Sequence, residues 1–171
     1  LLNRDIRFEV NTIAPYLITR ELLPIIDTNG VILNVSSAAQ EPVDLEALEQ
    51  FRAMGDMEAY AQSKLAMTAW SRYVANELTD WPSVISVNPG SLLATKMVNE
   101  GFGIEGKDLN IGADILVHLV TDLFDSQRTG ENFDNDEEED KSNVPMMRLL
   151  STCFLLLIVP TLLLLFFSMC V

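Results

Sequence analysis

The stretch GVILNVSS, residues 30–37, is a short apolar run that is rich in β-branched side chains. Apolar residues follow one another in it instead of alternating with polar ones, which is typical of a strand buried on both faces of a parallel sheet. SVISVNPG, residues 83–90, is a second run of this kind and ends in a turn. Residues 57–78 lie between the two runs and have helical periodicity. A strand, a helix and a strand in this order predict a parallel sheet with a helical crossover.

The segments on either side extend the same pattern. Residues 5–26 and 111–124 carry apolar side chains at helical spacing, and a short extended piece is expected around residues 132 and 133. A further short helix is expected near residues 45–51. We therefore predict an α/β fold with a Rossmann-like, doubly wound parallel sheet.

Two residues of the helix at 57–78 have a spacing with chemical meaning. Tyr60 and Lys64 lie four residues apart in AYAQSKLAM, so they lie about one turn apart on one face of the helix. An ammonium group beside a phenol oxygen favours the phenolate and makes a tyrosine usable for proton transfer. This spacing is also common on solvated helices, so the pair needs support from other residues.

Polar residues at the ends of the two strands give that support. Ser36 and Ser37 end the first strand, whereas the second ends in the Pro89-Gly90 turn, with Thr95 beyond it. In open α/β sheets, ligands bind outside the carboxyl ends of the strands. The hydroxyls, the turn and the Tyr/Lys helix are therefore expected at one edge of the sheet.

Taken in order, the motifs NVSS, YAQSK and VNPGSLLATKM resemble the short-chain dehydrogenase/reductase family over roughly residues 4–136. The resemblance implies that Tyr60 is the catalytic acid and base and that Ser37 hydrogen-bonds the substrate carbonyl. It implies that Lys64 activates Tyr60 and, together with it, contacts the nicotinamide ribose.

The same resemblance implies the remaining contacts and the activity. The cofactor, NAD or NADP, would also meet Pro89, Gly90 and Thr95, and the enzyme would be an oxidoreductase that transfers hydride between the nicotinamide and a small-molecule carbonyl or secondary alcohol. Family members often pair through the helix with the Tyr-x-x-x-Lys motif, so a homodimer is expected. The substrate and the choice between NAD and NADP stay open.

Asn11 is a fourth candidate for the catalytic site. Pro15, four residues later, has no N–H, so the carbonyl of Asn11 loses its normal helical partner. We expect this carbonyl to hold a water next to Lys64 and complete a proton relay. The alternative is a simple proline kink.

Two family features are missing from the sequence. Neither the glycine-rich turn TGxxxGxG nor an NNAG-like strand is present, which predicts only the C-terminal, catalytic half of the domain. GFGIEG, residues 101–106, fits the spacing GxGxxG but follows no strand, so we interpret it as a loop on the substrate side. The alternative to an active enzyme is a truncated, catalytically inactive remnant attached to a membrane.

The C-terminal part of the chain differs in composition from the rest. DNDEEED, which begins at residue 134, contains six acids in seven residues, and residues 149–171 carry no charge. As a helix, the uncharged stretch would reach roughly 34 Å, enough to span a bilayer. We predict a partial dehydrogenase domain at 1–133, an acidic linker at 134–148 and a transmembrane anchor at 149–171. This predicts a membrane protein whose domain faces the cytosol; a cytoplasmic protein and a gene-model artefact at the apolar end are the alternatives.

Charge and cysteine content exclude other classes. The net charge of −14 argues against nucleic acid as a partner. The two cysteines, Cys153 and Cys170, both lie in the apolar end, so no CxxC metal site or disulfide framework is expected, and we predict no metal.

Overall fold

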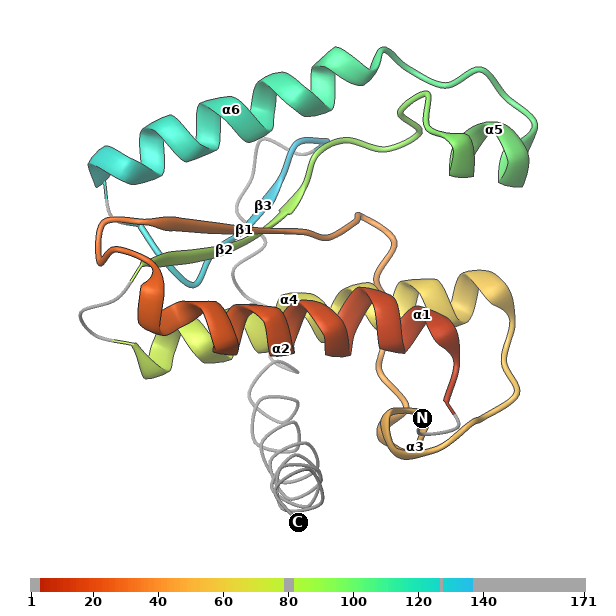
Figure 1. The fold of residues 1–171 in the computed structure, drawn as a ribbon. Coiled ribbons are helices and arrows are strands. Elements are labelled where there is room, and N and C mark those ends of the chain that lie inside the picture. The colour runs from red at the N-terminus through yellow and green to blue at the C-terminus, as the bar shows by residue number, and fades with distance from the viewer. Residues whose placement is uncertain (1–3, 79–81, 127, 137–171) are drawn as a thin grey trace.

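The protein has a three-stranded parallel sheet with helices on both faces (Figure 1), as shown by a computed structural model that describes residues 4–78, 82–126 and 128–136. The strands are β1 (Val31–Val35), β2 (Ser83–Asn88) and β3 (Asn132–Asp134), in the spatial order β1-β2-β3. This confirms the predicted α/β class with a parallel sheet. Because all three strands run the same way, their carboxyl ends meet at one edge of the sheet.

The helices have the following bounds, with a π-helical and a 3-10 segment labelled η1 and η2: α1 (Ile6–Phe8), η1 (Glu9–Ile13), α2 (Ala14–Leu22), η2 (Leu23–Ile25), α3 (Leu45–Glu49), α4 (Asp56–Glu77), α5 (Lys96–Phe102) and α6 (Leu109–Ser126). The first four form one continuous helical segment, as the sequence predicted. Helices α2 and α4 cover one face of the sheet, and α6 covers the other (Figure 1).

The register of the sheet follows from the pairing of β1 with β2. Val31 lies beside Ser83 and Val35 beside Val87, and the N–H of Ser36 donates to the carbonyl of Val87 at 2.7 Å. Successive residues of a strand direct their backbone groups to opposite sides. The carbonyl of Val35 therefore points away from β2, to the side of β1 opposite that strand.

The apolar core lies in two layers, one on each face of β2. The larger layer, toward α4, contains Phe8, Trp70 and Val74, all 0% exposed, and Trp70 meets Tyr16 edge-on with 5.6 Å between the ring centres. The smaller layer, toward α6, is centred on the following four residues: Ile85, Val87, Leu119 and Leu123. All six residues of β2 are buried, because helices cover both faces of this strand.

Helix α5 corrects the sequence analysis in part, because the loop expected at 101–106 begins only at Gly103, after the end of this helix. Thr95 caps the helix, since its Oγ1 accepts a hydrogen bond from the N–H of Val98 at 3.3 Å. Gly103 ends the helix in the left-handed region at φ 65°. The first glycine of GFGIEG thus lies inside a helix, and the second terminates it.

The first acids of the linker expected at 134–148 pack against the domain. Asp134 is the last residue of β3 and is buried, and the N–H of Asp136 donates to Asp134 Oδ1 at 3.1 Å. The acids at the start of the run therefore belong to the domain, because β3 brings them against the end of β2. The rest of the predicted linker and the predicted anchor at 149–171 lie outside the described residues. No helix in the described part of the chain is long and apolar enough to cross a membrane.

Candidate active site

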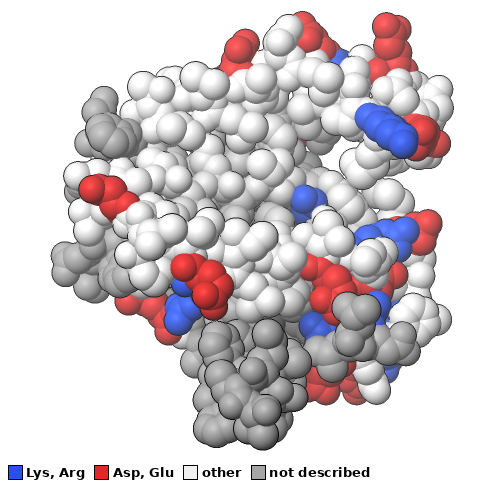
Figure 2. Space-filling view, in the orientation of Figure 1, with Lys and Arg blue, Asp and Glu red and all other residues white. Residues whose placement is uncertain are grey.

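A pocket of about 250 Å³ opens at the carboxyl edge of the sheet. Its walls come from the residues that follow β1 and β2 and from α4 and α5. Figure 2 shows the surface hollowed on the side of the molecule where α5 lies. The position agrees with the general rule that open parallel sheets bind ligands beyond the carboxyl ends of their strands.

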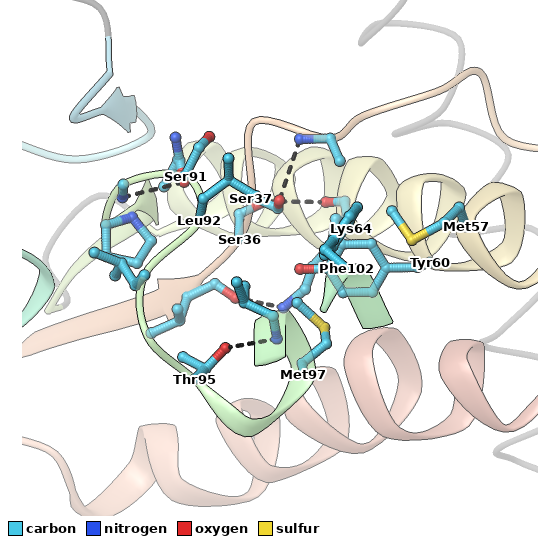
Figure 3. A pocket seen from close by; sticks show the side chains of 17 residues that line it. Ser36, Ser37, Met57, Tyr60, Lys64, Ser91, Leu92, Thr95, Met97 and Phe102 are labelled. Atoms are coloured by element: carbon cyan, nitrogen blue, oxygen red, sulfur yellow. Dashed lines mark hydrogen bonds between the residues drawn. The ribbon is translucent and has the colours of Figure 1, made fainter. Parts of the chain in front are cut away.

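Tyr60 and Lys64 enter the pocket from one face of α4 (Figure 3). The Nζ of Lys64 lies 5.7 Å from the ring centre of Tyr60 and donates a hydrogen bond to the carbonyl of Val35 at 2.8 Å. Burial lowers the pKa of Lys64, because the charged ammonium loses solvation. The outward-pointing carbonyl of β1 therefore holds the cation beside the phenol.

The two serines after β1 have different environments. Ser36 is 4% exposed, and its Oγ hydrogen-bonds Thr68 Oγ1 at 2.8 Å and the carbonyl of Lys64 at 3.2 Å. Ser37 is only partly buried, lines the pocket and accepts the N–H of Ala39 on its Oγ at 3.1 Å. Ser36 thus ties β1 to α4, whereas the hydroxyl proton of Ser37 can be donated to a ligand.

The turn after β2 supplies the opposite wall of the pocket. Pro89 and Gly90 line it, and Gly90 has a φ of 128°, a conformation that side chains with a Cβ rarely adopt. Asn88 Oδ1 accepts the N–H of Gly90 at 3.3 Å, which supports the turn from within. Thr95, farther along, also lines the pocket while capping α5.

Asp136 fixes this turn from outside, a role that the sequence analysis missed. Its Oδ2 accepts the N–H of Ser91 at 2.8 Å, the hydroxyl of Ser91 at 2.5 Å and the Nδ2 of Asn88 at 2.9 Å. Lys107 Nζ lies 3.6 Å from its other oxygen. Burial alone would raise the pKa of Asp136, but the bonds from Ser91 and Asn88 and the charge of Lys107 together lower it from 3.8 to about 2. The only sequence signal was its position just beyond a strand that ends beside Asn88.

Asn11 does not line the pocket but contacts the helix behind it. The carboxamide Nδ2 of Asn11 donates to Ser63 Oγ at 3.0 Å, and Ser63 Oγ donates to the carbonyl of Tyr60 at 2.7 Å. Asn11 lies in the π-helical segment η1, which ends just before Pro15. Pro15 has no N–H to donate to the carbonyl four residues earlier, and the N–H of Ala14 donates to the carbonyl of Glu9 in the π-helical pattern. The predicted water next to Lys64 stays a prediction.

Comparison with known proteins identifies the family to which the chain belongs. A family model described as short chain dehydrogenase matches residues 4–102, which is more than half of the chain. The chain belongs to the short chain dehydrogenase family. No curated protein matches it significantly.

Solved structures of short chain dehydrogenases and related oxidoreductases share the fold. The oxidoreductase yciK from E. coli has a TM-score of 0.57 and 26% identity, with 76% of this chain and 51% of that chain covered. A Shigella flexneri short chain dehydrogenase complexed with NADP has a TM-score of 0.56 and 25% identity, with coverage of 76% and 52%. The landomycin C-6 ketoreductase LanV, with bound NADP and rabelomycin, has a TM-score of 0.52 and 25% identity, with coverage of 74% and 48%. The chain thus spans about half the length of these proteins.

The fold brings most of the predicted site residues together. The pocket is lined by six of them: Ser37, Tyr60, Lys64, Pro89, Gly90 and Thr95. Asn11 lies behind α4 and does not line the pocket; its side chain donates a hydrogen bond to Ser63 on that helix. In the described ranges no group of acidic, histidine or cysteine side chains is arranged to hold a metal ion.

Proposed function

We propose that this chain forms the catalytic part of an NAD(P)-dependent oxidoreductase that acts on a carbonyl compound or a secondary alcohol, with Tyr60 as the acid and base. One observation carries the proposal. Tyr60, Lys64 and Ser37 come from two different elements and open into a single pocket at the carboxyl edge of the sheet. Chance spacing on a solvated helix does not account for this convergence.

Each of the three side chains has a distinct task in this proposal. The hydroxyl of Ser37 donates a hydrogen bond to the substrate oxygen and orients it. Tyr60 gives that oxygen a proton during reduction and takes one during oxidation. The ammonium of Lys64, whose Nζ lies 5.7 Å from the centre of the Tyr60 ring, supplies a positive charge next to the reacting groups.

The pocket residues fit the nicotinamide end of a dinucleotide. Pro89 and Gly90 line the pocket opposite Lys64, and Lys64 has donors left for ribose hydroxyls after its bond to Val35. Thr95 offers a hydroxyl to the carboxamide. When bound, the cofactor supplies or accepts the hydride. NADP in the Shigella and LanV structures supports a nicotinamide cofactor here as well.

The inactive remnant is the second candidate, and one observation favours it. Within residues 4–78, 82–126 and 128–136, the GxGxxG sequence at 101–106 ends a helix instead of opening one. A pyrophosphate is normally held at a helix N-terminus behind a glycine-rich turn. Under this alternative the 171-residue chain binds no dinucleotide. Titration of NADPH with the chain, followed by nicotinamide fluorescence, separates the candidates, since saturable binding rejects the remnant.

Substitution of Lys64 tests the proposed function directly. In the intact protein that carries this sequence, Lys64→Ala should lower kcat/KM for NADPH-dependent carbonyl reduction at least about 100-fold. Lys96→Ala is the matched control, because Lys96 is an exposed lysine on α5 whose ammonium lies 3.8 Å from Glu100. Equal activity of the two variants would reject the assignment of Lys64.

Two further proposals concern the assembly. A homodimer through α4, taken from the family resemblance, is tested by light scattering of the purified protein. Membrane attachment through residues 149–171, with the domain facing the cytosol, is tested by fractionation as described below.

A further inference from the structure

Four large apolar side chains line the pocket into which Tyr60 opens. They line it from α4, from the turn after β2 and from α5, and each is about half exposed: Met57 51%, Leu92 43%, Met97 50% and Phe102 49%. Figure 3 shows Met57, Met97 and Phe102 grouped around the tyrosine ring. Single exposed apolar residues are normal, but a group that lines one pocket marks a binding surface.

Leu92 is held in this wall against its backbone preference. Its φ of 57° lies in the left-handed region, which is unfavourable for a bulky residue. The carbonyl of Leu92 accepts the N–H of Lys107 at 2.7 Å, and the N–H of Ala94 donates to the carbonyl of Lys107 at 2.7 Å. Strained residues of this kind persist where surrounding contacts fix them, often at ligand sites.

The pocket lining offers few charged groups that could pair with an ionic substrate. Lys64 is the one charged residue among the described residues that line it, and its ammonium already bonds the carbonyl of Val35. The wall offers no second cation for a carboxylate or phosphate and no carboxylate for an amine.

We propose that the substrate is an uncharged, apolar carbonyl compound or the corresponding alcohol, an inference that rests on the proposed function. Its oxygen lies against Tyr60 and Ser37, and its hydrocarbon body lies against the group of Met57, Leu92, Met97 and Phe102. Two of these four are methionines, whose flexible thioethers adapt to different shapes. The pocket wall therefore selects substrates of low polarity rather than substrates of one particular shape.

Binding measurements that need no turnover test this inference. Acetophenone and benzoylformate differ in that a carboxylate replaces the methyl group beside the ketone, and each is titrated into the intact protein by ligand-observed NMR. We expect acetophenone to bind at least about tenfold more tightly, because benzoylformate must desolvate a carboxylate without a partner. Met97→Lys adds a cation to the wall and should reverse this preference.

Truncation of the wall provides the second arm of the experiment. Phe102→Ala should weaken acetophenone binding about tenfold. Ile18→Ala is the matched control, since Ile18 is an apolar residue of α2 that is 58% exposed and does not line the pocket. Circular dichroism establishes that each variant is folded.

The outcomes separate this inference from the proposed function. No binding of acetophenone, equal binding of the two ketones, or no effect of Phe102→Ala would each overturn the apolar substrate class. An inactive site would instead appear as normal acetophenone binding without any NADPH-dependent reduction.

Discussion

The hydrogen bonds between Asp136 and Ser91 make the stability of this domain sensitive to acid in a predictable direction. The pKa of Asp136 is about 2 in the folded protein, against 3.8 for an unperturbed aspartate. A carboxyl group whose pKa is lower in the folded state stabilises the fold above its unfolded pKa and loses that contribution as the pH falls through its folded pKa. The contribution should therefore be complete near neutral pH and disappear between about pH 4 and pH 2.

The magnitude follows from the same two pKa values. A difference of one pH unit corresponds to about 1.4 kcal/mol, so the charge of Asp136 contributes at most ~2.5 kcal/mol to the free energy of unfolding. Because 26% of its side chain is exposed, solvent screens part of these interactions. We expect a contribution of about 1 kcal/mol.

Urea unfolding of the intact protein, followed by circular dichroism, measures this contribution. Asp136→Asn should lower the free energy of unfolding by about 1 kcal/mol near neutral pH and by less than about half of that near pH 2.5. Glu100→Gln removes an exposed carboxylate of α5 as the control and should change stability by less than about 0.5 kcal/mol at either pH. A gap between wild type and Asp136→Asn that is the same at both pH values would refute the reasoning.

Two other predictions concern the loop beside the pocket and the end of the chain. Gly106→Ala should destabilise the fold by about 2–3 kcal/mol in thermal or urea unfolding. The reason is that Gly106 has a φ of +82° and that a Cβ there would lie 2.8 Å from the backbone of Ala94. Gly101→Ala is the control and should be neutral or stabilising, because a Cβ on Gly101 meets nothing within 4 Å. A similar loss in both variants would contradict this. A fluorescent fusion to residues 141–171 should sediment with membranes and resist carbonate extraction, whereas a soluble fusion would argue against an anchor.

The sequence predicted the sheet and the principal helices because their signals are local. Apolar runs of β-branched residues at 30–37 and 83–90 became β1 and β2, and helical periodicity placed α4 and α6 within a few residues. Most of the site was predictable for a related reason. Residues that follow parallel strands meet at one edge, so Ser37 and Gly90 could be placed together from order alone.

The features that were missed depend on contacts between distant segments. Asp136 belongs to a run of acids that resembles a solvated linker, and its role appears only when β3 lies beside β2 and brings it to Ser91. Helix α5 was missed because GFGIEG follows no strand and was therefore interpreted as a loop. Thr95 caps that helix and Gly103 ends it, so capping outweighed the poor helix propensity of glycine.

The central claim is that the phenol of Tyr60 transfers the proton, and one pair of substitutions tests it most directly. Tyr60→Phe removes only the phenol oxygen, and Tyr73→Phe removes the oxygen of a second tyrosine on α4, which bonds Glu77 away from the pocket. In the intact protein that carries this sequence, kcat/KM for NADPH-dependent carbonyl reduction should fall at least about 100-fold in Tyr60→Phe and stay unchanged in Tyr73→Phe, with the same circular dichroism spectrum in both. Substantial activity in a folded Tyr60→Phe variant would contradict the account.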